Sequence, residues 1–189
     1  MFLGIYSANE EEVRLQTSTK KEIFSWITTI AVVAIIVFLA RTFLVTPVSV
    51  NGMSMEPTFE HSDKLIISKI SDIENFDMIV FNAPNKDEEY IKRVIGKPGD
   101  SVKMEDGVLY INDKSYEEPY IKENHDGSDD FTLKELTGKE KVPDGQLFVL
   151  GDNRSNSKDS RAFGFISSDS VVGEVKFQFY PWQEIGIPD

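Results

Sequence analysis

Ser54 is the residue of this chain whose surroundings best suit nucleophilic chemistry. A serine hydroxyl is a weak nucleophile and needs a neighbouring base to take its proton. Histidine is the usual base, and the chain has two: His61, in a polar turn that also holds Asp63, and His125. A Ser–His–Asp arrangement is therefore one hypothesis. The absence of cysteine excludes a thiol nucleophile, a disulfide framework and thiolate metal sites.

Lys92 is the second candidate for the base. It lies in the apolar run 90–95 and is followed by Arg93. Neighbouring residues of a strand face opposite sides, so Lys92 is predicted to point into the core and Arg93 to solvent. Burial penalises the ammonium form and lowers the pKa of a lysine, which supplies a neutral amine near pH 7. Periodicity alone also fits a Lys92 that faces solvent.

A third polar segment, residues 151–161, follows the apolar run 148–150. It concentrates turn-forming residues, hydroxyls and paired charges. Such a density of hydrogen-bonding groups is typical of a loop that supports an active centre, although an ordinary polar turn has a similar composition.

The elements that must position these groups begin with a membrane anchor. Residues 23–40 form an apolar stretch of 18 residues without a charge, bounded by Glu22 and Arg41. This length favours a retained transmembrane helix over a cleaved signal peptide, whose apolar region has about 7–15 residues. Lys20 and Lys21 on the N-terminal side predict a single-pass protein with a cytoplasmic tail, residues 1–22.

Residues 41–189 are then predicted to form an extracytoplasmic catalytic domain, and the fold class is mostly β. Short β-branched runs separated by turn residues indicate the strands, and residues 131–136 have room for one helical turn. Residues 122–130 read as an exposed polar loop. A calcium site from Asp126, Asp129 and Asp130 fits less well than a solvated loop. The predicted strands are 64–69, 78–81, 90–95, 101–104, 108–111, 146–150 and 171–180.

The charge of the chain limits its partners. The formal net charge is −12 over 189 residues. An acidic protein repels phosphate backbones, so we expect no nucleic-acid partner. The excess of acid either favours substrates with basic flanks or keeps the domain soluble. We expect no cofactor and no metal.

The three segments that follow the anchor have a distinctive order. They read Gly52-x-Ser54-Met55-x-Pro57-Thr58, then Tyr90-Ile91-Lys92-Arg93-Val94-Ile95-Gly96-x-Pro98-Gly99-Asp100, then Gly151-Asp152-Asn153-Arg154-x-Asn156-Ser157-x-Asp159-Ser160-Arg161. Together with the preceding anchor they resemble the type I signal peptidase family, in its bacterial serine–lysine form. The resemblance extends from about residue 20 to 180. It implies a signal-peptidase-like β domain and an endopeptidase that removes signal peptides from secreted preproteins.

The resemblance also implies roles for individual residues. Ser54 matches the nucleophile, and its backbone N–H matches an oxyanion donor. Lys92 matches the general base, and Ser157 the serine that orients the lysine amine. Asp159 and Arg161 match a structural ion pair. Asp152 and Arg154 also fall on the motif, and we expect them to be structural.

Gly52 departs from the version of the motif in which a serine two residues before the nucleophile completes the oxyanion hole. It matches the Gram-positive version and leaves the second donor open. The implied substrate carries small residues at the first and third positions before the cut and binds as an extended strand. The expected pocket residues are Val50, Gly52, Met55, Tyr90 and Ile91. The implied partners are signal peptides of exported preproteins and membrane lipid.

Three other functions remain open at this point. A homologue without activity could only bind peptides, but Ser54, Lys92 and Ser157 are all present. A self-processing regulator with the same chemistry would have a DNA-binding segment and no anchor. A β-rich interaction module would not need a hydroxyl and an amine in these ordered motifs.

Overall fold

The computed structural model describes residues 3–84, 87–121 and 130–188, with side chains from residue 21 on. The chain divides into two units, residues 1–43 and 44–189. The first unit is a single helix, α1 (Leu3–Phe43). Its stretch Lys21–Phe43, 23 residues long, is apolar enough to cross a membrane and is not buried against protein. At 1.5 Å per residue it measures about 35 Å, enough for a hydrocarbon core of about 30 Å.

The threonines of α1 show how its polar side chains fit an apolar surrounding. Thr28, Thr29 and Thr42 each donate a hydroxyl hydrogen bond to the carbonyl four residues earlier. These bonds satisfy the three threonine hydroxyl donors without water. The predicted anchor, residues 23–40, lies inside this helix.

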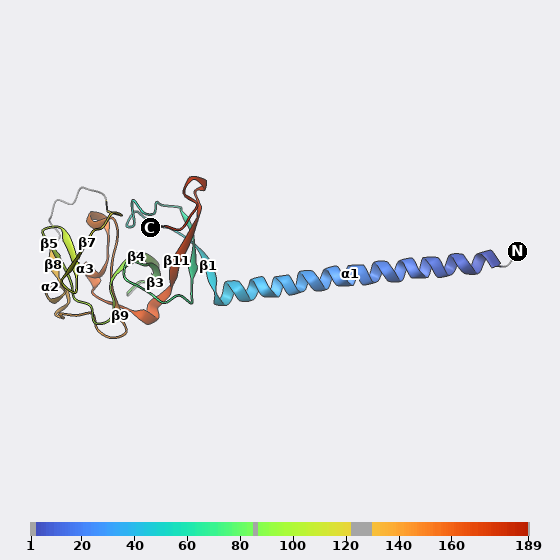
Figure 1. Ribbon diagram of the computed structural model, residues 1–189, viewed down its shortest axis with the longest axis horizontal. Helices are drawn as coiled ribbons and strands as arrows, with labels where there is room; N and C mark the ends of the chain where they lie inside the picture. Colours follow the sequence, from blue (N-terminus) through green and yellow to red (C-terminus); the bar gives the residue numbers. More distant parts are fainter. Residues whose placement is uncertain (1–2, 85–86, 122–129, 189) are drawn as a thin grey trace. The chain divides into compact units, whose positions relative to one another are not determined.

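The second unit contains a seven-stranded antiparallel sheet with the order β1-β2-β11-β3-β4-β9-β10 (Figure 1). Strand β11, the last of the chain, lies between β2 and β3, which come much earlier in the sequence. The sheet therefore joins segments that are far apart in the chain. The strands are β1 (Val45–Ser49), β2 (Lys64–Ser68), β3 (Met78–Asn82), β4 (Glu89–Gly96), β9 (Gln146–Leu150), β10 (Ile166–Ser167) and β11 (Val171–Tyr180).

A smaller four-stranded sheet has the order β7-β6-β5-β8, and its strands gather to one side of β4 and β9 in Figure 1. It consists of β5 (Val102–Glu105), β6 (Val108–Ile111), β7 (Lys114–Tyr116) and β8 (Phe131–Thr132). The short helices are α2 (Leu133–Thr137), α3 (Ser160–Phe163), η1 (Arg154–Asn156), η2 (Ser168–Ser170) and η3 (Trp182–Glu184). Thr132 and Glu135 form a capping box that starts α2, and Gly138 ends it in the left-handed conformation.

Apolar side chains cover both faces of the central strands. In β9, Leu147 and Val149 pack with Ile166 on one face, while Phe148 and Leu150 pack towards the small sheet on the other. The two strands β3 and β9 therefore read as nearly continuous apolar runs, without alternation between apolar and polar residues.

The position of β4 matters for the site. Over Glu89–Arg93 it pairs with β3, but its pairing with β9 begins only at Arg93. The backbone from Glu89 to Lys92 therefore has an open edge within the part of the chain that the structure describes. An extended peptide can add to such an edge by main-chain hydrogen bonds.

The mostly β fold with one N-terminal apolar helix is confirmed. All seven predicted strands are present, and α2 lies where one helical turn was expected. The short strands β1, β7, β8 and β10 were not predicted. Residues 122–129 of the predicted loop, with Asp126 and Asp129, lie outside the described residues. Asp130 is exposed and accepts the backbone N–H groups of Asp106 and Gly107.

Candidate active site

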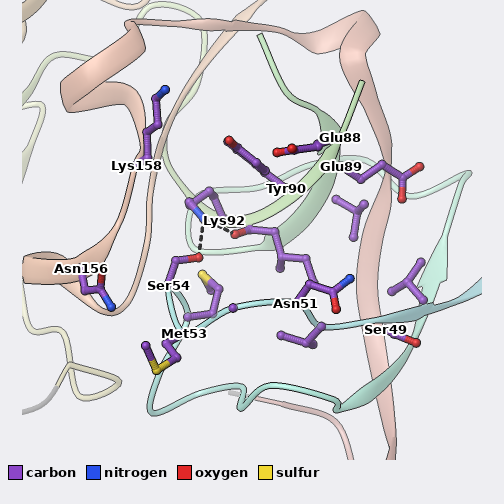
Figure 2. A pocket seen from close by; sticks show the side chains of 16 residues that line it. Ser49, Asn51, Met53, Ser54, Glu88, Glu89, Tyr90, Lys92, Asn156 and Lys158 are labelled. Carbon is purple, nitrogen blue, oxygen red and sulfur yellow. Dashed lines mark hydrogen bonds between the residues drawn. The ribbon is translucent and has the colours of Figure 1, made fainter. Parts of the chain in front are cut away.

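Ser54 and Lys92 meet at the floor of a cleft (Figure 2). Lys92 Nζ lies 2.6 Å from Ser54 Oγ and donates a second hydrogen bond to the carbonyl oxygen of Ile91, at 2.8 Å. Lys92 is 3% exposed. The two residues are 38 positions apart in the chain, so the register of β4 and the turn after β1 bring them together.

The surroundings of Lys92 favour its neutral form. Burial lowers its pKa from 10.5 to about 8, although the carboxylates of Asp159 and Asp152 act in the opposite direction. Its hydrogen-bond acceptors among the described residues, Ser54 Oγ and the Ile91 carbonyl, are both uncharged. A lysine with a pKa near 8 exists partly as the free amine at neutral pH, so it can accept a proton from a neighbouring hydroxyl.

The turn that carries Ser54 is anchored on both sides. Met55 and Phe59 are buried, and Phe59 N–H donates to the Met55 carbonyl at 2.9 Å. Gly52 has a φ of +93°, a conformation that L side chains rarely adopt. Its N–H donates to His61 Nδ1 at 3.3 Å, so His61 braces this turn. That arrangement favours Lys92 over His61 as the base, and His125 lies outside the described residues.

The segment 151–161 forms a braced loop, as expected. Asp159 accepts the Gly151 N–H at 3.0 Å, caps α3 and pairs with Arg161 at 2.9 Å. Ser157 Oγ is buried and has no hydrogen-bond partner among the described residues. The bond from Ser157 to Lys92 implied by the motif is therefore not formed in this arrangement.

Gly151 lies where this loop meets the turn of Ser54. A Cβ at this position would stand 2.5 Å from the Ser54 carbonyl oxygen and 2.2 Å from Ser157 Oγ. Next to it, Asn153 donates its backbone N–H to the Ser54 carbonyl at 3.1 Å and its side chain to the Met53 carbonyl at 2.9 Å. The absence of a side chain at Gly151 is what allows the two loops to approach so closely.

Arg93 corrects an expectation, because it does not face solvent. It is 2% exposed and binds Asp152 in a bidentate ion pair, with Nε–Oδ1 at 3.0 Å and Nη2–Oδ2 at 2.7 Å. Asp152 also accepts the hydroxyl of Thr58 at 2.6 Å. The simple alternation failed because both faces of β4 are covered, with Ile91 and Ile95 on the face of Arg93 and Val94 on the other.

The cleft above Ser54 has a volume of about 750 Å³. It is lined by all five expected pocket residues: Val50, Gly52, Met55, Tyr90 and Ile91. Figure 2 shows Glu88 and Glu89 together on one side, and Asn156 and Lys158 on the loop at the other side. Ser157 does not line this cleft. In the described part of the chain, no group of three or more histidine or acidic side chains is placed to hold a metal ion.

Comparison with known proteins identifies the family of this chain. The family model described as "Signal peptidase, peptidase S26" matches residues 23–181. The chain belongs to the signal peptidase family. Signal peptidase IB of Staphylococcus aureus (strain COL) is 42% identical over 179 residues, which cover 87% of this chain and 93% of the relative. Signal peptidase I of Bacillus caldolyticus is 44% identical over 169 residues, 84% of this chain and 90% of the relative.

A solved structure supports the fold of this signal peptidase. The crystal structure of a signal peptidase I from Enterococcus faecalis V583 matches with a TM-score of 0.52 at 42% sequence identity. The match covers 56% of this chain and 97% of that chain. Family membership assigns this chain the removal of signal peptides as its activity and serine-type peptidase chemistry as its class.

Two residues near the site of this signal peptidase were missed by sequence reasoning. Glu118 pairs with Arg154, and the ring of Tyr120 lies over the guanidinium of Arg93. They belong to a short connection after β7 that looks like an ordinary polar loop. No signal in the sequence separates these side chains from the exposed ones beside them.

Proposed function

We propose that this protein is a membrane-anchored endopeptidase that cleaves preproteins after small-x-small sites, with Ser54 as nucleophile and Lys92 as general base. The observation that carries the proposal is the 2.6 Å contact between Lys92 Nζ and Ser54 Oγ, at a lysine whose pKa burial lowers to about 8. A nucleophile and a base within hydrogen-bond reach are what hydroxyl-based acyl transfer requires.

In this mechanism the neutral amine of Lys92 accepts the proton of Ser54 while Oγ attacks the scissile carbonyl. The tetrahedral intermediate collapses to an acyl-enzyme, and the ammonium of Lys92 gives its proton to the departing amine. Lys92, neutral again, then takes a proton from the water that hydrolyses the ester. Ser157 takes part by orienting the amine once its buried hydroxyl turns to Nζ.

The oxyanion of the intermediate requires donors. We assign one to the backbone N–H of Ser54. Gly52 has no hydroxyl to offer, so the second donor in this mechanism is a water or another backbone N–H. Removal of one such donor from a working enzyme costs about 3–4 kcal/mol, so the site needs a replacement for the missing hydroxyl.

The walls of the cleft support a preference for small substrate residues. Val50 and Met55 are buried and cannot move aside easily, and Ile91 packs against them. A bulky side chain would overlap these walls. The substrate backbone is proposed to lie along the open edge of β4, from Glu89 to Lys92, where β9 does not reach.

The anchor fits a substrate that is itself held in a membrane. Ser54 follows Phe43, the last residue of α1, by 11 positions, which limits its distance from the helix end to ~40 Å of extended chain. We propose an extracytoplasmic catalytic unit and a cytoplasmic N-terminus, in line with Lys20 and Lys21 before the apolar stretch.

The test is cleavage of a preprotein with an Ala-x-Ala site by the full-length protein in liposomes. Ser54→Ala and Lys92→Ala are compared with the wild type, and the new N-terminus of the product is sequenced. The matched controls are Ser115→Ala, at an exposed position of the small sheet, and Lys103→Ala, at a half-buried position of the same sheet. A cut directly after the Ala-x-Ala site, lost only in the first two variants, is expected. A cut that survives Lys92→Ala but not His61→Ala would return the role of base to histidine.

A further inference from the structure

Residues 117–121, which we call the strap, leave β7 of the small sheet and reach the ion pairs behind the catalytic loops. The strap belongs to none of the three motifs. Two of its side chains each contact an arginine of a motif. Tyr120 lies over Arg93 of the second motif, and Glu118 binds Arg154 of the third.

The contact to Arg93 is a stacked one. The guanidinium carbon of Arg93 lies 3.8 Å from the centroid of the Tyr120 ring, on a side chain that Asp152 already holds. Burial raises the pKa of Tyr120, so its phenol remains a neutral donor. Its hydroxyl donates to Glu118 at 2.7 Å, which joins the two contacts of the strap. Guanidinium over an aromatic face is favourable, and more so when water is excluded.

The contact to Arg154 is a buried bidentate ion pair. Glu118 and Arg154 side chains are 7% and 2% exposed, and the two oxygens accept from Nη2 and Nη1 at 2.5 and 3.2 Å. The same arginine donates its Nε to the Gly151 carbonyl at 3.0 Å. Its own carbonyl accepts from Arg161 at 2.7 Å. Glu118 therefore holds the Arg154 side chain, which binds the start of the catalytic loop at Gly151, while the Arg154 backbone accepts a bond from Arg161 at the end of the loop.

Among the described residues, each arginine behind the site pairs with a carboxylate, and the strap supplies one of these carboxylates. Three arginines lie in this cluster, Arg93, Arg154 and Arg161, and two motif carboxylates, Asp152 and Asp159, pair with the first and the last. Glu118 is the partner of Arg154. Without Glu118 the buried guanidinium of Arg154 would lack a counter-ion among the described residues and would tend to move towards water, away from the Gly151 carbonyl.

We infer that Glu118 and Tyr120 are positioning residues for the peptidase reaction. The strap holds Arg93 and Arg154, and these keep the strand of Lys92, the turn of Ser54 and the loop of Gly151 in register. This inference rests on the proposed Ser54–Lys92 mechanism. Neither strap residue lines the cleft, so the strap acts on the chemical step and not on substrate binding.

The decisive comparison is Glu118→Gln against Glu117→Gln in the full-length protein, with a soluble peptide substrate. Glu117 is the exposed neighbour and supplies a control with the same chemical change. Glu118→Gln is expected to lower kcat about 10- to 100-fold with KM within about twofold, because small misplacements of reacting groups have effects of that size. Glu118→Asp, which keeps the charge, should recover part of kcat, and Glu117→Gln should equal the wild type.

All three variants are assayed at a temperature at which circular dichroism shows them folded. A Glu118→Gln variant with wild-type kcat, or with a raised KM and unchanged kcat, would overturn the inference even if its Tm falls. Should that variant fail to fold, Tyr120→Phe takes its place, since it removes only the hydroxyl bond to Glu118. A kcat about two- to fivefold lower is expected there, and an unchanged kcat overturns the inference.

These outcomes are separate from those of the proposed function. If the wild type cleaves the peptide and Ser54→Ala does not, the peptidase mechanism stands whatever the strap variants do. If the wild type cleaves neither the peptide nor the preprotein, the proposed function is wrong, and the inference that rests on it is wrong as well.

Discussion

Lys92 and Arg93 are neighbours on β4, equally buried, and in opposite electrostatic situations. Arg93 has a bidentate carboxylate, an aromatic face and the Phe76 carbonyl around its guanidinium. Lys92 has two uncharged acceptors, and burial lowers its pKa to about 8. A buried cation with a full set of partners stays charged and holds structure together. A buried cation without a bonded anion gives up its proton readily, which is what a base needs.

The largest expected effect comes from removing Lys92, the buried cation that has no directly bonded carboxylate among the described residues. Lys92→Met keeps the length of the side chain and deletes the base, so activity should fall about 10²- to 10⁴-fold. Stability at neutral pH should not fall, because the ammonium that was costly to bury is gone. Peptide cleavage and urea unfolding of the same preparation test both statements. Loss of activity together with a strong loss of stability would mean that Lys92 is a structural cation like Arg93.

Removal of Arg93, the cation paired with Asp152, is expected to lower stability. Arg93→Met leaves Asp152 buried without its partner, which should lower the free energy of unfolding by about 3–5 kcal/mol. Urea unfolding in detergent micelles measures it. The control is the double variant Arg93→Met with Asp152→Asn, which removes the stranded charge and should recover part of the loss. If the single variant loses less than about 1 kcal/mol of unfolding free energy, Arg93 is not the stabilising cation that its comparison with Lys92 requires.

Gly151 lies where the loop 151–161 contacts the turn of Ser54, and Gly151→Ala tests whether this close contact matters for the reaction. The new Cβ would clash with the Ser54 carbonyl, a backbone atom that cannot swing aside. We expect about a 10²-fold loss in kcat, because the turn of Ser54 is displaced from Lys92. Gly145→Ala, at an open glycine with a φ of +71°, is a control for backbone strain alone. Equal activity of both variants would show that the close approach at Gly151 has no effect on the reaction.

The pH dependence of the reaction should report the lowered pKa of Lys92. Because the neutral amine is the active form, kcat/KM should rise about tenfold per pH unit up to about pH 8 and then level off. Unfolded Lys92 keeps its proton until pH 10.5, so between about pH 8 and 10.5 the unfolded state binds more protons and stability should rise with pH. Lys92→Met should lack this rise. A profile with its midpoint near 10.5 would contradict the lowered pKa.

Much of the architecture could be predicted from local patterns. Strands such as β6, β9 and β11 have the predicted bounds, because β-branched runs ended by turn residues are local signals. The missed strands β8 and β10 have two residues each and exist through pairing with β5 and β9. The predicted orientation of Arg93 towards solvent was wrong for a related reason. Alternation along a strand identifies its two faces, but it does not show which other segments cover each face.

The sequence by itself determined the anchor, the strand runs and the identity of the groups that can react, because apolar length, turn residues and ordered motifs are properties of neighbouring residues. Only the tertiary structure decided that Lys92 Nζ lies within hydrogen-bond reach of Ser54 Oγ, that Lys92 is buried beside uncharged acceptors while Arg93 is paired with a carboxylate, and that Gly151 lets two loops touch. It also brought Glu118 and Tyr120 to arginines far away in the chain. Distance, dielectric surroundings and counter-ions depend on contacts between remote segments, and no local pattern records them.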